Sequence, residues 1–95
     1  MSLLRIVIKR PGESAAIAEI ENTLEAMQEV VGGLIERFQY IRGYSCYANE
    51  EGLLLGLTPN GPVVGTFYVS QEDSEGNSVP LSLKEALDIA WSLNE

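Results

Sequence analysis

Histidine is absent from this 95-residue chain and cysteine occurs once, and both scarcities limit its chemistry. Histidine is the commonest general base and a leading zinc ligand, so its absence removes the usual routes to acid–base catalysis and to a zinc site. Cys46 has no partner for an intrachain disulfide and no histidine to activate it, so we expect a small buried apolar side chain. We therefore predict a protein without enzymatic activity, metal or cofactor; catalysis by carboxylates alone is the alternative that the composition leaves open.

Basic residues are also scarce, since 6 lysines and arginines face 14 acidic residues and leave a net charge of −8. Binding to nucleic acid or to anionic membranes relies on Lys and Arg beside phosphate, so we expect neither as a direct partner. The acidic balance has two interpretations. It keeps the protein in solution, or it provides a surface for a basic protein partner.

Long apolar runs are missing as well. No stretch approaches the roughly 20 apolar residues of a membrane span, and the first residues lack the apolar core of a signal peptide. A lone cysteine suits a reducing compartment. These features together predict a cytoplasmic protein.

The order of the residue patterns predicts one α+β domain over residues 1–95. Within residues 3–9, apolar side chains alternate with Arg5 and Lys9, with Val7 as the exception, which is typical of a strand. The alanine-rich stretch 14–20 suits either a helix or a second strand. Asn22, with Glu25 three residues later, predicts the start of a helix. The pair Gly32-Gly33 predicts its end, because glycine accepts the left-handed conformation of a helix C-cap.

Further strands and a second helix are predicted in the rest of the chain. Residues 34–41 and 44–49 predict a hairpin, and residues 63–70 predict the last strand. Ser82 and Glu85 have the spacing of a capping box, which predicts a C-terminal helix. The fold class is therefore α+β, with a small, mainly antiparallel sheet and two helices. The apolar residues expected in its core include Leu24, Met27 and Val31, the run Leu53-Leu54-Leu55, and the stripe Leu83, Ala86, Leu87 and Ala90.

Aromatic and basic residues fall on the same predicted strands. Tyr47 and Tyr68 would stack a base, and Arg37 and Arg42 would hold a phosphate, if the strands bring them to one pocket. The alternative is that the aromatic residues fill the core, as they do in most sheets. We name these four residues as candidate ligand contacts.

Three glutamates, Glu21, Glu25 and Glu29, recur every fourth residue and line one face of the first predicted helix. Like charges at this spacing repel each other, and no lysine lies between them to compensate. They form either a solvated face or an acidic stripe that accepts basic groups from a partner or a second subunit.

Four short motifs resemble a known family when they are taken in order. They are Val31-Gly-Gly-Leu-Ile-Glu36, Asn49-Glu-Glu-Gly52, Leu57-Thr-Pro-Asn60 and Val64-Gly-Thr66. Together, and with the opening strand, they make residues 1–70 similar to the domain of unknown function numbered 3846. Thr58 stands where that family would have proline, and the C-terminal helix is less typical of it. The resemblance implies that the protein is encoded among the genes of phages, prophages or plasmids, where this family mostly occurs.

The polar residues within these motifs are the first candidates for ligand contacts that the resemblance implies. The glycines of the motifs end a helix or make turns, whereas Asn49, Glu50 and Asn60 carry polar side chains at turns of a rigid sheet. Turns of this kind are common positions for binding residues.

Small phage proteins often block host systems, so the resemblance predicts a non-enzymatic binding protein that counters host defence. The first hypothesis is a homo-oligomeric sponge that sequesters a nucleotide-derived immune signal, either cyclic ADP-ribose-like or a cyclic oligonucleotide. The second is an acidic inhibitor, DNA-mimic-like or anti-CRISPR-like, that binds a basic host nucleic-acid enzyme. A structural or accessory phage protein is the third.

Overall fold

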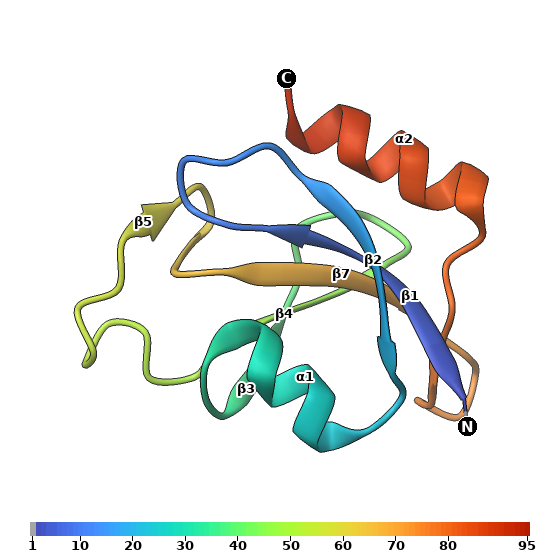
Figure 1. Cartoon of the computed structure of the whole chain (residues 1–95), viewed down its shortest axis with the longest axis horizontal. Helices are drawn as coiled ribbons and strands as arrows, with labels where there is room; N and C mark the ends of the chain where they lie inside the picture. Colours follow the sequence, from blue (N-terminus) through green and yellow to red (C-terminus); the bar gives the residue numbers. More distant parts are fainter. Residues whose placement is uncertain (1) are drawn as a thin grey trace.

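The computed structural model describes residues 2–95, which form a central sheet with one helix on each face (Figure 1). The main sheet has the strand order β2-β1-β7-β4-β3, β8 pairs with β7, and every pairing is antiparallel. A separate ribbon joins β5 to β6. The predicted α+β class, with a mainly antiparallel sheet and two helices, is therefore confirmed. The elements are β1 Leu3–Lys9, β2 Ala16–Glu21, α1 Leu24–Val31, β3 Ile35–Phe38, β4 Ser45–Asn49, β5 Pro59–Asn60, β6 Val63–Val64, β7 Phe67–Glu72, β8 Ser78–Val79 and α2 Leu83–Leu93.

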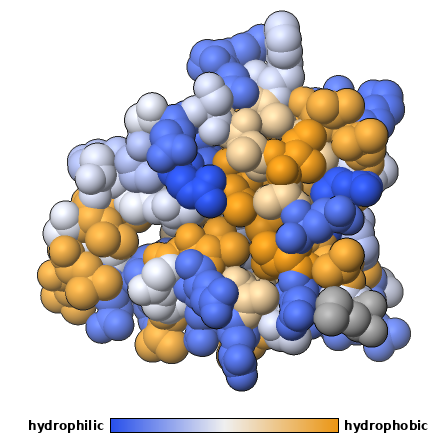
Figure 2. Space-filling view, viewed as in Figure 1, coloured by the Kyte–Doolittle hydropathy of each residue, from blue (hydrophilic) through white to orange (hydrophobic). Residues whose placement is uncertain are grey.

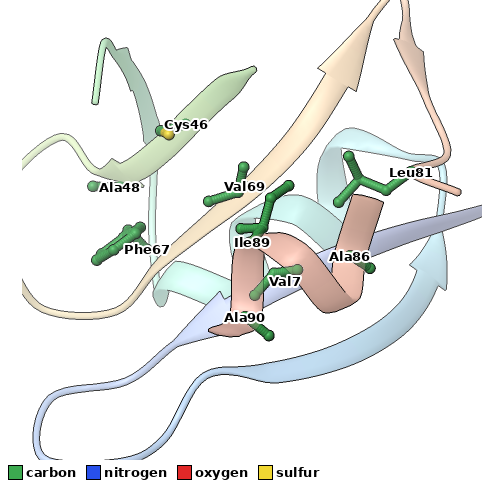
Figure 3. Close-up of a cluster of buried hydrophobic side chains, with 9 residues drawn as sticks. All are labelled: Val7, Cys46, Ala48, Phe67, Val69, Leu81, Ala86, Ile89 and Ala90. Carbon is green, nitrogen blue, oxygen red and sulfur yellow. The ribbon is translucent and has the colours of Figure 1, made fainter. Parts of the chain in front are cut away.

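Strand β1 is buried on both sides because a helix covers each face of the sheet. Leu4, Ile6 and Ile8 alternate toward the face covered by α1, where Val31 and Tyr68 join them. Val7 points to the other face and packs in the cluster covered by α2 (Figure 3). A strand with apolar residues on both faces is expected at the centre of a covered sheet.

Helix α1 begins one residue later than the sequence predicts. Thr23 is the N-cap, and its side-chain oxygen accepts from the Ala26 amide at 3.2 Å. The Asn22 side chain instead donates to the main-chain oxygen of Ser78 at 3.1 Å, so it is engaged with β8. The predicted end of the helix is confirmed, since Gly32 is the C-cap with φ of 79°.

Strands account for several segments that the sequence left open or divided differently. The ambiguous stretch 14–20 contains β2, which pairs along β1. The predicted hairpin is confirmed as β3 and β4, with Ile35 opposite Asn49. The last predicted strand, 63–70, is split into β6 and β7 around Gly65, whose φ is 81°.

The leucine run 53–55 was expected in the core, and this expectation is wrong. Leu53 and Leu54 are 84% and 85% exposed. They lie in the turn that follows β4, whose main chain is closed by hydrogen bonds from Leu55 to Glu51 at 2.9 Å and from Leu57 to Gly52 at 3.0 Å. A compact turn bonded to itself points its side chains outward, whatever their polarity.

Helix α2 has the predicted capping box, but its buried stripe differs from the expected one. The Ser82 side chain accepts from the Glu85 amide at 3.1 Å, and the Glu85 carboxylate accepts from the Ser82 amide at 3.0 Å. Small residues face the sheet and allow a close approach, so the helix is rotated relative to the prediction. Ala86, Ile89 and Ala90 are buried, whereas Leu83, Leu87 and, on α1, Leu24 are exposed. Neither helix in residues 2–95 is long and apolar enough to cross a bilayer.

Candidate functional site

The four predicted base- and phosphate-binding residues do not share one open pocket. Tyr68 is fully buried and stacks on Tyr47, with ring centroids 5.2 Å apart and planes 23° apart. Burial raises the pKa of Tyr68 well above its usual range, and the nearby Tyr47 and Glu72 add to the shift. Arg42 is exposed in the turn between β3 and β4. Tyr68 thus belongs to the core beneath α1, as the alternative interpretation of the aromatic residues proposed.

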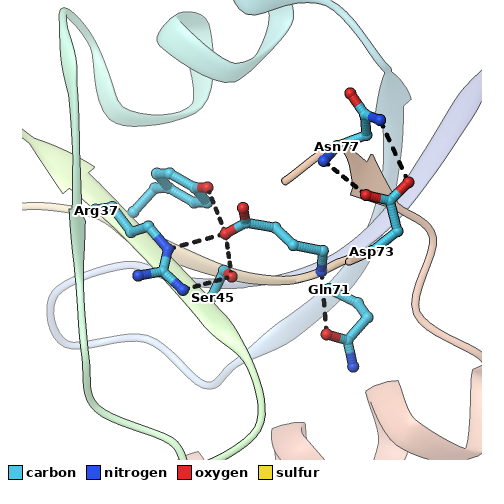
Figure 4. Close-up of polar contacts among 7 residues, drawn as sticks. Arg37, Ser45, Gln71, Asp73 and Asn77 are labelled. Atoms are coloured by element: carbon cyan, nitrogen blue, oxygen red, sulfur yellow. Dashed lines mark hydrogen bonds and ion pairs between the residues drawn. The ribbon is translucent and has the colours of Figure 1, made fainter. Parts of the chain in front are cut away.

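Arg37 is engaged in a polar cluster at the end of β7 (Figure 4). One carboxylate oxygen of Glu72 accepts from Arg37 Nε at 2.8 Å, from the Tyr47 hydroxyl at 3.0 Å and from the Ser45 hydroxyl. The Ser45 hydrogen bond, followed by those from Arg37 and Tyr47, lowers the pKa of Glu72. The charge of Arg37 is therefore already compensated within the chain.

The two predicted asparagines have partners inside the protein. Asn49 is buried, donates to the Val31 main-chain oxygen at 3.1 Å and accepts from the Glu51 amide at 2.8 Å. Asn60 is also buried, and its amide group donates at 2.9 Å to the main-chain oxygens of both Lys9 and Gly65. Both side chains hold loops in place, and a contact of either with a ligand stays a prediction.

A groove of about 670 Å³ lies on the face of the sheet opposite α1, between β3, the turn after β4 and the β5–β6 ribbon. Its lining is mostly apolar, and its charged residues are all acidic: Glu36, Glu50 and Glu51. We call this feature the acid-rimmed groove. The space-filling view shows apolar surface gathered at the left edge of the molecule, over the loop between β4 and β5 (Figure 2). The apolar lining of the acid-rimmed groove comes from Phe38, Ala48, Leu53, Leu54, Pro59, Pro62, Val63 and Val64.

Turn residues of the sequence motifs shape the acid-rimmed groove. The Asn49 main-chain oxygen accepts from the Gly52 amide at 3.2 Å and closes the turn that carries Glu50 and Glu51. Gly52 is buried against Val64, and a β-carbon there would lie 2.7 Å from a Val64 methyl group. Only glycine allows this approach, so the turn and β6 stay together as the two walls of the groove.

Sequence reasoning found Asn49 and Glu50 but missed most of the acid-rimmed groove. Glu36 and Phe38 lie on β3. Whether their side chains are exposed depends on which part of the sheet a helix covers, and the sequence does not show which part that is. The signal in the sequence was the run of three leucines that follows Glu50, Glu51 and Gly52 and ends at Gly56. A turn with glycine at each end places such residues at the surface.

The three glutamates of the predicted acidic stripe lie around one depression, but they do not share one helix face, because Glu21 is the last residue of β2 and only Glu25 and Glu29 belong to α1. Glu21, Glu25 and Glu29 are all exposed and line a second depression of about 580 Å³, between α1 and the strands β1 and β2. Arg10 also lines this depression, so a positive charge already lies beside the three carboxylates. Among the residues that the structure describes, no basic residue lines the acid-rimmed groove.

Comparison with known proteins gives a family. The pattern of the family described as "Domain of unknown function (DUF3846)" matches residues 4–90, which include most of α2 as well as the four motifs. No curated protein and no solved structure matches the chain.

Proposed function

This chain belongs to the DUF3846 family, and we propose that it is a non-enzymatic binding domain whose acid-rimmed groove holds a basic segment of a partner protein. The observation that carries the proposal is the lining of the groove. Apolar side chains form its floor and walls, and three carboxylates with no basic residue among them form its rim.

The apolar lining supports binding of a protein segment. Leu53 and Leu54 expose most of their surface, and burial of such side chains on association releases about 25 cal/mol for each Å² removed from water. Contiguous exposed apolar surface rimmed by polar residues is typical of interaction sites in small proteins.

The acidic rim supports a basic partner. Glu36, Glu50 and Glu51 are exposed, and the whole chain carries a charge of −8, so Lys or Arg on a partner is attracted both at long range and on contact. A host nucleic-acid enzyme, whose phosphate-binding surface is rich in Lys and Arg, is the partner class that suits this charge. We propose the cytoplasm as the setting for such a complex.

The same charges weigh against a nucleotide signal in this groove. A phosphate would meet three carboxylates, while Arg37 is paired with Glu72 on the other face of the sheet. The sponge hypothesis therefore stays a prediction for this protein, and the groove favours the hypothesis of an acidic inhibitor.

The test compares two variants that change the net charge equally. One replaces Glu36, Glu50 and Glu51 by Gln, and the matched control replaces Glu21, Glu25 and Glu29 by Gln. Binding of a fluorescent peptide in which lysine and leucine alternate at every second position, with threonine between them, is measured by anisotropy at 50 and 300 mM salt. We expect the groove variant to bind about tenfold more weakly at low salt, as three exposed charge contacts predict, and the control to bind within about twofold of the native protein.

Two results would contradict the proposal. Equal losses in both variants would mean that only net charge attracts the peptide. A thermal shift with cyclic ADP-ribose-like or cyclic oligonucleotide ligands, with no peptide binding, would return the function to a nucleotide sponge.

A further inference from the structure

Strand β3 ends the main sheet, and its outer edge borders the acid-rimmed groove. In residues 2–95 no strand pairs with that edge. The Leu34 main-chain oxygen accepts from the Glu50 amide at 2.8 Å, so the main-chain groups of Leu34 point toward β4. Main-chain groups alternate along a strand, so those of Glu36 also turn toward β4, while those of Ile35 and Arg37 face outward. The edge thus presents two residues with main-chain groups available for a further strand.

The side chains of β3 tie this edge to the groove. Glu36 and Phe38 point to the same side of the sheet, two residues apart, and both line the groove. A strand added beside β3 would place alternate side chains next to these two, about 5 Å away, and in reach of Leu53 and Leu54. On the opposite side of the sheet it would meet Arg37, whose charge is compensated by Glu72.

From these relationships we infer that the partner segment binds as an extended strand on the edge of β3, with a basic residue opposite Glu36 and an apolar residue opposite Phe38. The inference rests on the proposed function and specifies how the domain recognises the partner segment. Main-chain hydrogen bonds to Ile35 and Arg37 would supply affinity, and the groove would supply specificity, as in other strand-addition complexes. The recognised pattern is therefore a basic and an apolar residue separated by one residue.

The spacing of the residues that face the groove distinguishes an added strand from a helix laid in the groove. A helix would place its anchors three or four residues apart, whereas a strand places them two apart. Glu36 and Phe38 have the spacing of two because they belong to a strand themselves. Every second residue of the bound segment would therefore face the groove, next to Glu36 and Phe38.

The experiment uses an eight-residue peptide in which lysine and leucine alternate at every second position and threonine fills the others. Two derivatives carry N-methyl groups on either the odd or the even main-chain amides. We expect one derivative to bind the native protein at least tenfold more weakly, because its strand-facing amides are blocked, and the other to bind within about threefold of the parent. Bound peptide should slow hydrogen exchange at the Ile35 and Arg37 amides at least tenfold, and leave the amides of β2, the other edge strand, unchanged.

A pair of variants tests the protein side of the same contact. Arg37→Pro removes an outward N–H together with the arginine side chain, whereas Arg37→Ala removes the side chain alone. We expect only Arg37→Pro to lose at least tenfold in affinity. If the peptide binds and both methylated derivatives match the parent, strand addition is wrong while the proposed function stands. If the parent peptide does not bind, both are wrong.

Discussion

Asn49 donates its side-chain amide to the main-chain oxygen of Val31 at 3.1 Å, and this bond joins β4 to the last turn of α1. Val31 ends the helix, so its carbonyl group lacks a partner further along the helix. The other end of the Asn49 amide accepts from Glu51 in the wall of the acid-rimmed groove. One buried side chain therefore holds the end of a helix and the candidate site together.

Replacing Asn49 by alanine should destabilise the protein because both of its partners would be left unpaired. We expect the free energy of unfolding, measured in urea, to fall by about 2–3 kcal/mol. Glu50→Ala, at the exposed next residue, is the control and should change stability by less than about 0.5 kcal/mol. A loss below about 1 kcal/mol for Asn49→Ala would show that the amide is dispensable to the fold, and would strengthen its candidacy as a ligand contact.

Local patterns predicted most of the elements, because each depends on a few neighbouring residues. Gly32 ends α1 through its own left-handed conformation, and Ser82 with Glu85 opens α2 through two reciprocal bonds. The strands β3 and β4 are adjacent in sequence and pair as a hairpin. None of these features needs knowledge of the distant chain.

Features that depend on distant segments were missed. Glu72 meets Ser45 because β4 and β7 pair in a particular register across 27 residues, and the sequence around Glu72 indicates only a polar stretch. The burial of Asn60 similarly follows from its bond to Lys9, which is 51 residues away. The acid-rimmed groove is of the same kind, since three separate segments build it, and only its turn was recognisable beforehand.

Glu72→Gln should weaken the response of stability to acid. The pKa of Glu72 is lower in the folded protein than in the unfolded chain, so its stabilising effect is complete above the unfolded pKa of about 4.3. The effect is lost as the pH falls through the folded pKa, because the unfolded state then binds the proton first. We expect the variant to lose about 1 kcal/mol at pH 7, and its unfolding free energy to fall less steeply than that of the native protein below pH 4.5. If the unfolding free energy of the variant, measured in urea, falls with pH as steeply as that of the native protein, Glu72 does not cause the acid sensitivity. Glu36→Gln, at an exposed position, is the control.

Gly65→Ala should destabilise the protein more than an alanine at another left-handed glycine. A β-carbon at Gly65 would lie 2.7 Å from one Leu57 methyl group and 3.3 Å from its β-carbon, and φ is 81°. Gly12 has φ of 74° and open space around it, so Gly12→Ala reports the conformational strain alone, about 1 kcal/mol. We expect Gly65→Ala to cost about 1–2 kcal/mol more than this in thermal or urea unfolding. Equal costs would mean that Leu57 moves aside freely.

Self-association is predicted to use the outer face of α2. Leu83, Leu87 and Trp91 recur every fourth residue there and are 55%, 54% and 74% exposed. A chain of this length has a thin core, and a second copy would bury this row. We expect Leu87→Asp to shift the mass measured by analytical ultracentrifugation to that of a monomer, whereas Ser92→Asp, which adds the same charge at another exposed position of α2, leaves it unchanged. Native protein that is monomeric at high concentration would refute the prediction.

The two most exposed leucines should matter for binding and not for folding. Leu53 and Leu54 expose 84% and 85% of their surface, so replacing both by serine removes little that is buried and should change the unfolding free energy by less than about 0.5 kcal/mol. Ile89→Ala, in the core beneath α2, should cost about 2–5 kcal/mol in the same assay and serves as the comparison. The lysine–leucine peptide should bind the double serine variant at least tenfold more weakly, because the apolar wall of the acid-rimmed groove is lost. A stable variant with native affinity would place the partner elsewhere on the surface, whereas an unstable variant would mean that the leucines belong to the fold after all.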